Sequence, residues 1–365
     1  MSLLNISFKC PIFNYNHPKS LPFLSATLKL HRNAMDREQE EMQFLGFFGI
    51  YTESFKLIIS CRKIFSKISL SLITPLSFIV LLHMEVSSLL FCKIMHTEVE
   101  LQQTPSPAKS RKLSDLISSE LAFFWLFKAA YLTLYLIFSL LSTAAVVYTI
   151  ACIYTARELT FGKVMSVVPR VWKRLMVTFL CTIATMFVYH VATIFILVSC
   201  GLLLMQTDYV DAVLALVLLF YFVGFLYMTI IWQLASVVSV LEEAYGFQAM
   251  MKSKSLIKGK LWVATAIFVK LIVSFFIIQT AFQTLVVDGS IQGMGKRVVY
   301  AILCFLLLSK MILFGLVVQT VIYFVCKSYH HENIDKSSLS DHLDVYLGEY
   351  VPLKPKDVQL EQYQV

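Results

Sequence analysis

The chain has 365 residues, of which 58% are hydrophobic and only 15% are charged. Soluble domains average roughly 45–50% apolar and 25% charged residues, so this composition excludes a soluble globular protein. The net charge of +8 does not indicate a nucleic-acid-binding protein either, because the cations lie beside apolar segments and form no separate basic domain.

The eight cysteines predict neither a disulfide framework nor a zinc site. They form no CxxC pair, and no alternating pattern of Cys and His occurs. The sequence also contains no P-loop, no GxSxG motif and no HExxH motif. We therefore predict no catalytic, metal or cofactor site.

Residues 1–34 differ in composition from the rest of the chain. They contain three prolines and neither Asp nor Glu, whereas a segment rich in glutamate begins at Met35. A transit peptide is also poor in acidic residues, but it forms an arginine-rich amphipathic helix, and this segment has a single arginine. We favour an N-terminal extension, disordered or produced by the gene model, with the true start of the protein at Met35.

Six apolar segments are long enough to cross a membrane. A transmembrane helix needs about 20 apolar residues to cross a hydrocarbon core of about 30 Å. The predicted spans are residues 68–92, 121–155, 175–205, 209–241, 261–287 and 298–326. We therefore predict an all-α, polytopic membrane domain over residues 35–326 and a polar tail over residues 327–365.

The Lys and Arg residues outside the spans predict the orientation of the chain. The six spans leave seven flanking segments in residues 35–365. The first, third, fifth and seventh of these segments hold 18 Lys and Arg residues, whereas the second, fourth and sixth hold 6. Positive residues accumulate on the cytoplasmic side of a membrane, so we predict that both termini are cytosolic. We expect this membrane to be the plasma membrane or one of the endomembrane system.

A basic segment runs directly into the third span as GKVMSVVPRVWKRLMVTFL, residues 162–180. If residues 159–175 are helical, one face is apolar and the other is basic. The apolar face holds Phe161, Val164, Met165, Val168, Val171, Trp172 and Leu175, and the basic face holds Lys163, Arg170, Lys173 and Arg174. This pattern is typical of a helix in the membrane surface, so the four cations are predicted contacts of anionic lipid headgroups.

Similar segments precede the first and fifth spans. In residues 44–67 one face of a predicted helix holds Phe44, Phe47, Phe48, Tyr51, Phe55 and Ile58. A third copy begins near Phe247, although lysines interrupt its apolar face. The pattern indicates a weak threefold repeat of a basic, amphipathic cytoplasmic surface helix followed by a hairpin of spans.

Two lysines lie deep within predicted spans. Lys270 is nine residues inside the fifth span and Lys310 is twelve residues inside the sixth, distances of about 13 and 18 Å along a helix. A charge at such depth is costly. Either both side chains snorkel or bond to polar neighbours, or they form a site for an anionic lipid or solute. Lys128 lies nearer the end of its span and is expected to snorkel to water.

The tail contains two patterns that resemble functional motifs. His330 to Asp335 match the H-x4-D arrangement of lipid acyltransferases, but no acyl-acceptor block accompanies the pair, so we interpret Asp335 as a helix cap. Leu339, Leu343 and Leu347 then share one face of a short predicted helix. We expect this tail to contact a cytosolic protein partner.

Three segments carry a resemblance to a known family. They are residues 125–182, VVSVLEEAYGFQAMMKSKSLIKGK (237–260) and CKSYHHENIDKSSLSDHLDVYLGEYVPLK (326–354). The chain resembles a plant family of uncharacterised integral membrane proteins, some of which are labelled poly(A)-binding-protein-binding protein. The resemblance covers nearly all of residues 35–365, implies that residues 1–34 are additional, and supplies no functional residues.

The surface helices and hairpins are also distantly similar to the membrane domain of bacterial glycerophosphodiester phosphodiesterases, but the chain lacks their soluble catalytic domain. The sequence therefore favours a non-enzymatic membrane-organising or adaptor protein whose partners are the lipid bilayer and a cytosolic protein. One alternative is a transporter or channel for an anionic solute or lipid that uses Lys270 and Lys310. A second alternative is a lipid-modifying enzyme, which would need a set of His and Asp residues near the headgroups.

Overall fold

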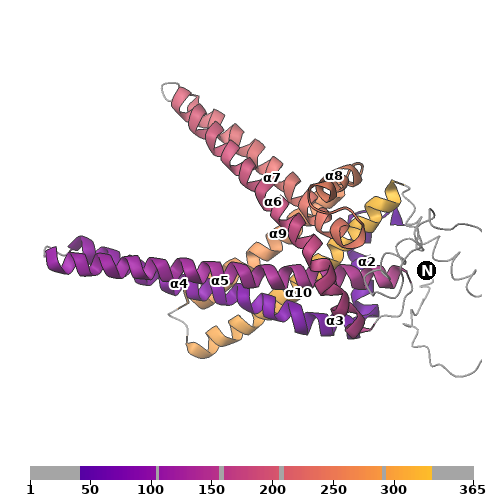
Figure 1. The fold of residues 1–365 in the computed structure, drawn as a ribbon, viewed down its shortest axis with the longest axis horizontal. Coiled ribbons are helices and arrows are strands. Elements are labelled where there is room, and N and C mark those ends of the chain that lie inside the picture. Colours follow the sequence, from indigo (N-terminus) through magenta and orange to yellow (C-terminus); the bar gives the residue numbers. More distant parts are fainter. Residues whose placement is uncertain (1–41, 104–106, 156–159, 205–208, 290–292, 331–365) are drawn as a thin grey trace, which may run out of the picture. The chain divides into compact units, whose positions relative to one another are not determined.

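The computed structural model describes residues 42–103, 107–155, 160–204, 209–289 and 293–330, and these residues contain helices and no strand. The helices are α2 (Phe47–Ser60), α3 (Arg62–Ile68), α4 (Thr74–Gln103), α5 (Pro107–Tyr154), α6 (Phe161–Leu204), α7 (Val210–Leu241), α8 (Phe247–Leu256), α9 (Leu261–Phe282) and α10 (Met294–Tyr329) (Figure 1). Two π-helical turns extend them, η1 (Ser69–Ile73) before α4 and η2 (Gln283–Val287) after α9. The extension over residues 1–34 and the tail helix over residues 335–347 lie outside the described residues.

Among the described residues, six helical stretches are long and apolar enough to cross a membrane, which confirms the predicted all-α, polytopic fold. They are Arg62–Leu101, Leu113–Tyr154, Phe161–Leu203, Val210–Leu241, Leu261–Val287 and Met294–Tyr329. The first three have 40, 42 and 43 residues, about twice the length that crosses the hydrocarbon core. They exceed the predicted spans because the polar segments that flank each apolar run continue the same helix.

The described residues belong to two compact units. Among the described residues, unit 1 draws on 42–64, 143–267 and 317–330, and unit 2 draws on 65–142 and 268–316. Unit 1 therefore contains α2, α6, α7, α8 and one end each of α5, α9 and α10. Unit 2 contains α4 and the remaining parts of α5, α9 and α10.

The core of unit 1 combines many β-branched side chains with the large, fully buried rings of Tyr323 and Phe324. Its fully buried members include Val146, Val147 and Ile150 of α5, Val164, Val168 and Val171 of α6, Leu234, Val237 and Val238 of α7, and Val317, Val321 and Ile322 of α10. Buried hydroxyls lie among them, and those of Thr149, Ser239 and Ser253 each donate to the carbonyl four residues earlier. Each hydroxyl thus keeps a partner where water is absent, so polar side chains fit between closely packed helices.

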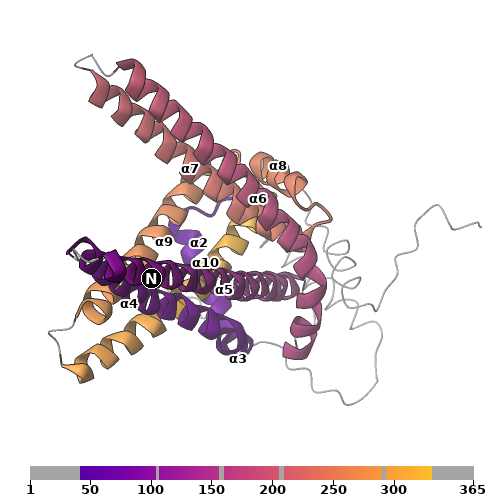
Figure 2. The same cartoon turned by 60° about the vertical axis from the view of Figure 1, so that its left-hand side comes forward.

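Helices α6 and α7 form a long antiparallel hairpin in unit 1 (Figures 1 and 2). The Tyr189 hydroxyl of α6 donates to the Tyr221 carbonyl of α7 over 2.8 Å, and the two rings stack with centroids 5.6 Å apart. A Cβ atom at Gly224 would collide with the Tyr189 hydroxyl. The helices approach this closely because Gly224 has no side chain.

Unit 2 has its own core where α4, η2 and α10 meet. Its buried members are Val80 and Leu81 of α4, Phe282 of α9, Val286 of η2, and Cys304 and Leu308 of α10. Helices α4 and α5 run side by side in both views (Figures 1 and 2), and Lys93 of α4 pairs with Glu120 of α5 over 3.1 Å. This ion pair joins parts of the two helices that lie beyond the predicted spans.

The basic segment before the third span is continuous with that span. No helix end occurs at residue 175, because α6 runs unbroken from Phe161 to Leu204 with Pro169 inside it. Proline has no N–H group for the helical hydrogen bond and crowds the preceding turn, which bends a helix. Figure 2 shows the first turns of α6 at an angle to the rest of the helix. Helices α2 and α8, in contrast, are separate short helices, although the predicted helix over residues 44–67 is divided between α2 and α3, and α3 belongs to the first candidate span.

Candidate functional site

The first turns of α6 carry the four predicted headgroup contacts on one helix. Arg170 and Lys173 are exposed, and Lys163 and Arg174 are half-buried. The sequence has no acidic residue between Phe161 and Leu175. The outward side of this segment is therefore basic along its whole length, and we call these four cations the basic edge.

The opposite face of the same segment is covered by protein. Val164, Val168, Val171 and Leu175 are each no more than 1% exposed. They belong to the face that the sequence predicts to lie on lipid, whereas in the structure they pack into the core of unit 1. Spacing alone cannot separate the two cases, because an amphipathic pattern shows that a face is buried but not what buries it.

The beginning of α8 is fixed to α6 and α7 by a buried hydroxyl. Gly246 precedes α8 with a φ of 62°, and its N–H donates to the Thr178 hydroxyl oxygen over 2.7 Å. The same oxygen lies 2.7 Å from the Ser239 hydroxyl of α7. A left-handed backbone favours glycine, so Gly246 both turns the chain after α7 and supplies the N–H that Thr178 accepts.

Replacing Thr178 with Val is expected to destabilise the protein by about 2 kcal/mol, because the buried N–H of Gly246 loses its acceptor. Thr185→Val is the matched control, since the Thr185 hydroxyl bonds only to the Cys181 carbonyl of its own helix among the contacts shown. Denaturant unfolding of both purified variants in mixed micelles measures the difference. Equal loss in the two variants would contradict a specific role for the Thr178 hydroxyl.

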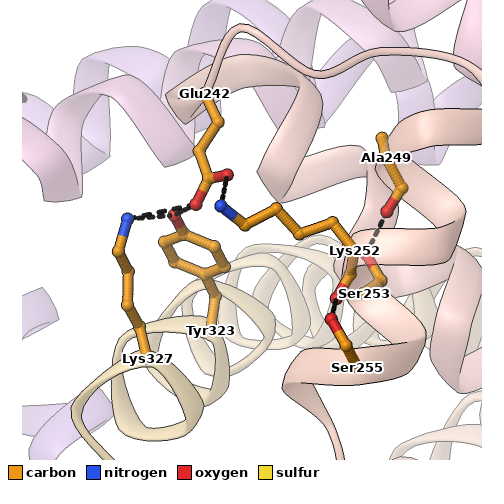
Figure 3. Close-up of polar contacts among 7 residues, drawn as sticks. All are labelled: Glu242, Ala249, Lys252, Ser253, Ser255, Tyr323 and Lys327. Carbon is orange, nitrogen blue, oxygen red and sulfur yellow. Dashed lines mark hydrogen bonds and ion pairs between the residues drawn. The ribbon is translucent and has the colours of Figure 1, made fainter. Parts of the chain in front are cut away.

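Glu242, directly after α7, binds two lysines and a tyrosine (Figure 3). One carboxylate oxygen lies 2.6 Å from the Lys252 ammonium of α8. The other lies 3.1 Å from the Lys327 ammonium of α10 and accepts a hydrogen bond of 2.5 Å from the Tyr323 hydroxyl. These four side chains, which we call the Glu242 cluster, tie α7, α8 and α10 together.

The Glu242 cluster carries a net positive charge. Burial raises the pKa of Glu242, but the charge of Lys327 and the hydrogen bonds from Lys252, Tyr323 and Lys327 outweigh it and hold the pKa below its ordinary value. The carboxylate is therefore ionised at neutral pH, where it faces two ammonium groups. Its side chain is 12% exposed and that of Lys252 is 36% exposed, so the cluster lies at the surface of unit 1.

Sequence reasoning did not find the Glu242 cluster. Lys252 follows Glu242 by ten residues and Lys327 by 85, separations that no local pattern connects. The available signal was the acidic pair Glu242–Glu243 at the end of an apolar span, on the side that the charge count predicts to be basic. An acidic residue in basic surroundings indicates an ion pair, but it does not indicate which residues are its partners.

Further contacts hold the chain around this cluster. The Arg174 guanidinium donates to the Glu243 carbonyl over 3.3 Å and lies 5.7 Å from the centre of the Tyr245 ring. His330 Nε2 lies 3.0 Å from the carbonyl oxygens of both Leu256 and Lys258. Since carbonyls only accept, Nε2 carries the proton there, and His330 ties the end of α10 to the turn between α8 and α9. Asp335 of the H-x4-D pattern lies outside the described residues.

Lys270 and Lys310 are both exposed on apolar, outward faces of their helices. On α9, Lys270 lies among Val273 and Ile277, and on α10, Lys310 follows Leu306 and Leu307, all of which are exposed. The structure therefore places neither lysine in the core of unit 2. This position favours contact with lipid or water over a path through the protein interior.

In unit 2, two further cations have side-chain partners that the sequence did not indicate. The Lys128 ammonium lies 2.8 Å from His83 Nε2, whereas the sequence predicts that Lys128 reaches water. Arg297 pairs with Glu85 over 3.4 Å and also donates through Nε to the Val286 carbonyl over 2.9 Å. Each contact joins different helices, so periodicity along a single helix cannot reveal it.

Comparison with curated proteins and with solved structures gave no significant match. A family model described as "Domain of unknown function (DUF8558)" matches residues 35–363. The match begins at Met35, the residue at which the composition of the sequence changes, and it includes all six candidate spans and the Glu242 cluster. The chain therefore belongs to this family, DUF8558.

Proposed function

We propose that this protein is a non-enzymatic membrane-organising component that holds anionic lipid headgroups on its basic edge. The proposal rests on the way in which the helix that carries this edge is packed. Arg170 and Lys173 are exposed on a helix whose opposite face is no more than 1% exposed at Val164 and Val168. The cations are thus presented outward from a helix that is already folded and packed.

Such an arrangement favours binding for two reasons. Each cation near an anionic membrane surface contributes about 1 kcal/mol, so the four together contribute a few kcal/mol. A segment that is ordered before it binds loses little conformational entropy on binding. Because the attraction acts between exposed charges, it should weaken as salt shortens the Debye length from about 10 Å at 0.1 M to about 3 Å at 1 M.

The experiment compares two variants of the full-length protein with equal charge. The test variant combines Lys163→Gln, Arg170→Gln and Lys173→Gln, and it spares Arg174 because that side chain also holds the Glu243 carbonyl. The control combines Lys109→Gln, Arg111→Gln and Lys296→Gln, three exposed cations on the predicted opposite side of the membrane.

Binding of phosphatidylserine and phosphatidylcholine with identical acyl chains is measured by native mass spectrometry of the purified proteins. The test variant should lose about 100-fold in affinity for phosphatidylserine, from about 1 kcal/mol for each of three cations. The control should keep its affinity, and neither variant should change in affinity for phosphatidylcholine. Equal losses in the two variants would overturn the proposal, because net charge alone would then explain the binding.

The same proposal includes the orientation of the chain. The 18 to 6 distribution of Lys and Arg supports cytosolic termini, a basic edge on the cytoplasmic leaflet, and a tail free to bind a cytosolic partner. We place the protein in the plasma membrane or the endomembrane system of a plant cell, on the family resemblance of its sequence.

The orientation predicts the outcome of glycosylation mapping. An inserted Asn-X-Ser acceptor site should be glycosylated between α4 and α5, at residues 104–106, because that loop should face the lumen or the exterior. The same insertion between α5 and α6, at residues 156–159, should stay unmodified. Electrophoretic mobility with and without glycosidase reads out both insertions. Modification of the second site instead of the first would reverse the orientation.

The two alternatives receive less support from the contacts. A transporter that uses Lys270 and Lys310 would need both side chains to line a path through the membrane, whereas both lie on outward apolar faces. For a lipid-modifying enzyme, the contacts give His330 a structural role, because its Nε2 donates to two backbone carbonyls and ties the ring to the turn between α8 and α9.

A further inference from the structure

Helix α2 presents a row of large apolar side chains outward from unit 1. Phe48 is 80% exposed, Phe55 is 56% exposed and Ile59 is 64% exposed. These residues are seven and four positions apart, so they share one face of the helix. Phe44, just before the helix, is 79% exposed. We call Phe48, Phe55 and Ile59 the aromatic stripe.

The rest of α2 prevents the aromatic stripe from turning inward. Ile50, Ser54 and Leu57 lie on the opposite face and are buried in unit 1. Rotating the helix to cover Phe48 and Phe55 would expose this face. Helix α2 is thus apolar on two opposite faces, of which the described part of the chain covers one.

The only polar side chain within the aromatic stripe forms its hydrogen bond inside the helix, so it can lie against an apolar neighbour. Thr52 lies between Phe48 and Phe55, and its hydroxyl donates to the Phe48 carbonyl over 2.9 Å. A hydroxyl that bonds to its own helix needs no water as a partner. The charged residues Glu53 and Lys56 lie together beside the stripe, with their charges 3.9 Å apart. The stripe therefore has one polar border, as expected for a helix at the boundary between lipid and water.

The chain itself places α2 at such a boundary. Helix α2 ends at Ser60, and the first candidate span begins two residues later, at Arg62. At about 1.5 Å per residue the 14 residues of α2 extend about 21 Å. No part of the stripe can therefore lie farther than about that distance from the start of the span.

We propose that the aromatic stripe of α2 inserts into the boundary between headgroups and acyl chains, in the leaflet where the first span begins. Aromatic side chains favour this depth of the membrane. The occupant of the exposed face is then lipid, whereas on the first turns of α6 the corresponding apolar face is covered by protein. This contact is hydrophobic, so it does not depend on the basic edge or on anionic lipid.

The test uses the photoreactive amino acid benzoylphenylalanine in the full-length protein, reconstituted in vesicles of phosphatidylcholine. Phe48 and Phe55 are replaced one at a time, and Lys56, exposed on the polar border, is the matched control position. After illumination, mass spectrometry identifies what each position has captured. Substitution at these exposed positions leaves the buried face of α2 intact.

Phosphatidylcholine adducts should form at positions 48 and 55 and be at least fivefold rarer at position 56. Cross-linked pairs of chains at positions 48 and 55 would overturn the proposal, because a second copy would then cover the stripe. Absence of any lipid adduct at these positions, or equal adducts at all three, would overturn it as well. The use of a neutral lipid separates this result from the test of the basic edge, which requires phosphatidylserine.

Discussion

Replacing Glu242 with Ala is expected to lower the free energy of unfolding by about 3 kcal/mol. The carboxylate is 12% exposed and binds Lys252, Lys327 and Tyr323, so its removal leaves two ammonium groups close together without their counter-ion. Loss of one partner of a buried pair costs about 3–5 kcal/mol. The lower value applies here because the half-exposed Lys252 can turn toward water.

Two comparisons test the assignment of this loss to the Glu242 cluster. Glu243→Ala is the control, because the Glu243 side chain is exposed and Arg174 binds only its backbone carbonyl among the contacts shown. Adding Lys327→Met to Glu242→Ala should restore part of the stability, since an unpaired ammonium is then absent. Denaturant unfolding in mixed micelles is measured for the wild type, Glu242→Ala, Lys327→Met, the double variant and Glu243→Ala. Strictly additive losses for Glu242 and Lys327 would contradict a direct coupling between the two charges.

The same cluster predicts how stability depends on pH. The pKa of Glu242 is lower in the folded protein than its ordinary value of 4.5. Its contribution is therefore fully present above pH 4.5 and is lost as the pH falls through the lower, folded pKa. In the Glu242→Gln variant this part of the acid sensitivity should disappear. The difference in unfolding free energy between the two proteins should be constant from pH 5 to 8 and shrink only below that range.

The six spans could be predicted from the sequence because the signal for a span is local. An apolar run of about 20 residues identifies a transmembrane helix without knowledge of its neighbours. The ends of the helices were predicted less well. Polar residues such as Lys93 and Glu120 stabilise helical extensions through contacts between α4 and α5, and those contacts depend on a pairing that the sequence does not state.

The environment of an amphipathic face could not be predicted in the same way. The segments near Phe48 and near Val168 have similar spacing of apolar residues, yet one face is exposed and the other is buried. The kind of side chain gives a physical reason. Val164, Val168 and Val171 are short and β-branched, so they let helices approach closely. Phe48 and Phe55 are bulky, and aromatic rings are favoured at a membrane interface.

The candidate site was predicted only in part, because only some of its charged residues are near one another in the sequence. Lys163, Arg170, Lys173 and Arg174 could be found because four cations near one another in the sequence share one helix. The Glu242 cluster draws on α7, α8 and α10, so it exists only after these helices have packed. Its role in tying α7, α8 and α10 together could not be deduced before the fold was known.

Replacing Gly259 with Val is expected to destabilise the protein by about 3 kcal/mol. Gly259 has a φ of 89°, a left-handed conformation that costs about 1–3 kcal/mol in other residues and is least tolerated by a β-branched one. A Cβ atom would also collide with the ring of Tyr329, whose hydroxyl oxygen would lie 2.9 Å away. Moving this ring disturbs the neighbouring His330, which ties α10 to the carbonyls of Leu256 and Lys258.

Three further variants separate the backbone strain from the collision. Gly246→Val changes a glycine with a φ of 62° whose Cβ would meet only atoms 3.4 Å away, so it should show the cost of strain with little collision. Tyr329→Ala, added to Gly259→Val, should remove the collision and leave the strain. Gly162→Val should be nearly neutral, because nothing lies within 4 Å of its Cβ position. If Gly259→Val proved as mild as Gly162→Val, the turn between α8 and α9 would not require glycine, and the contact of Tyr329 with it would have no structural role.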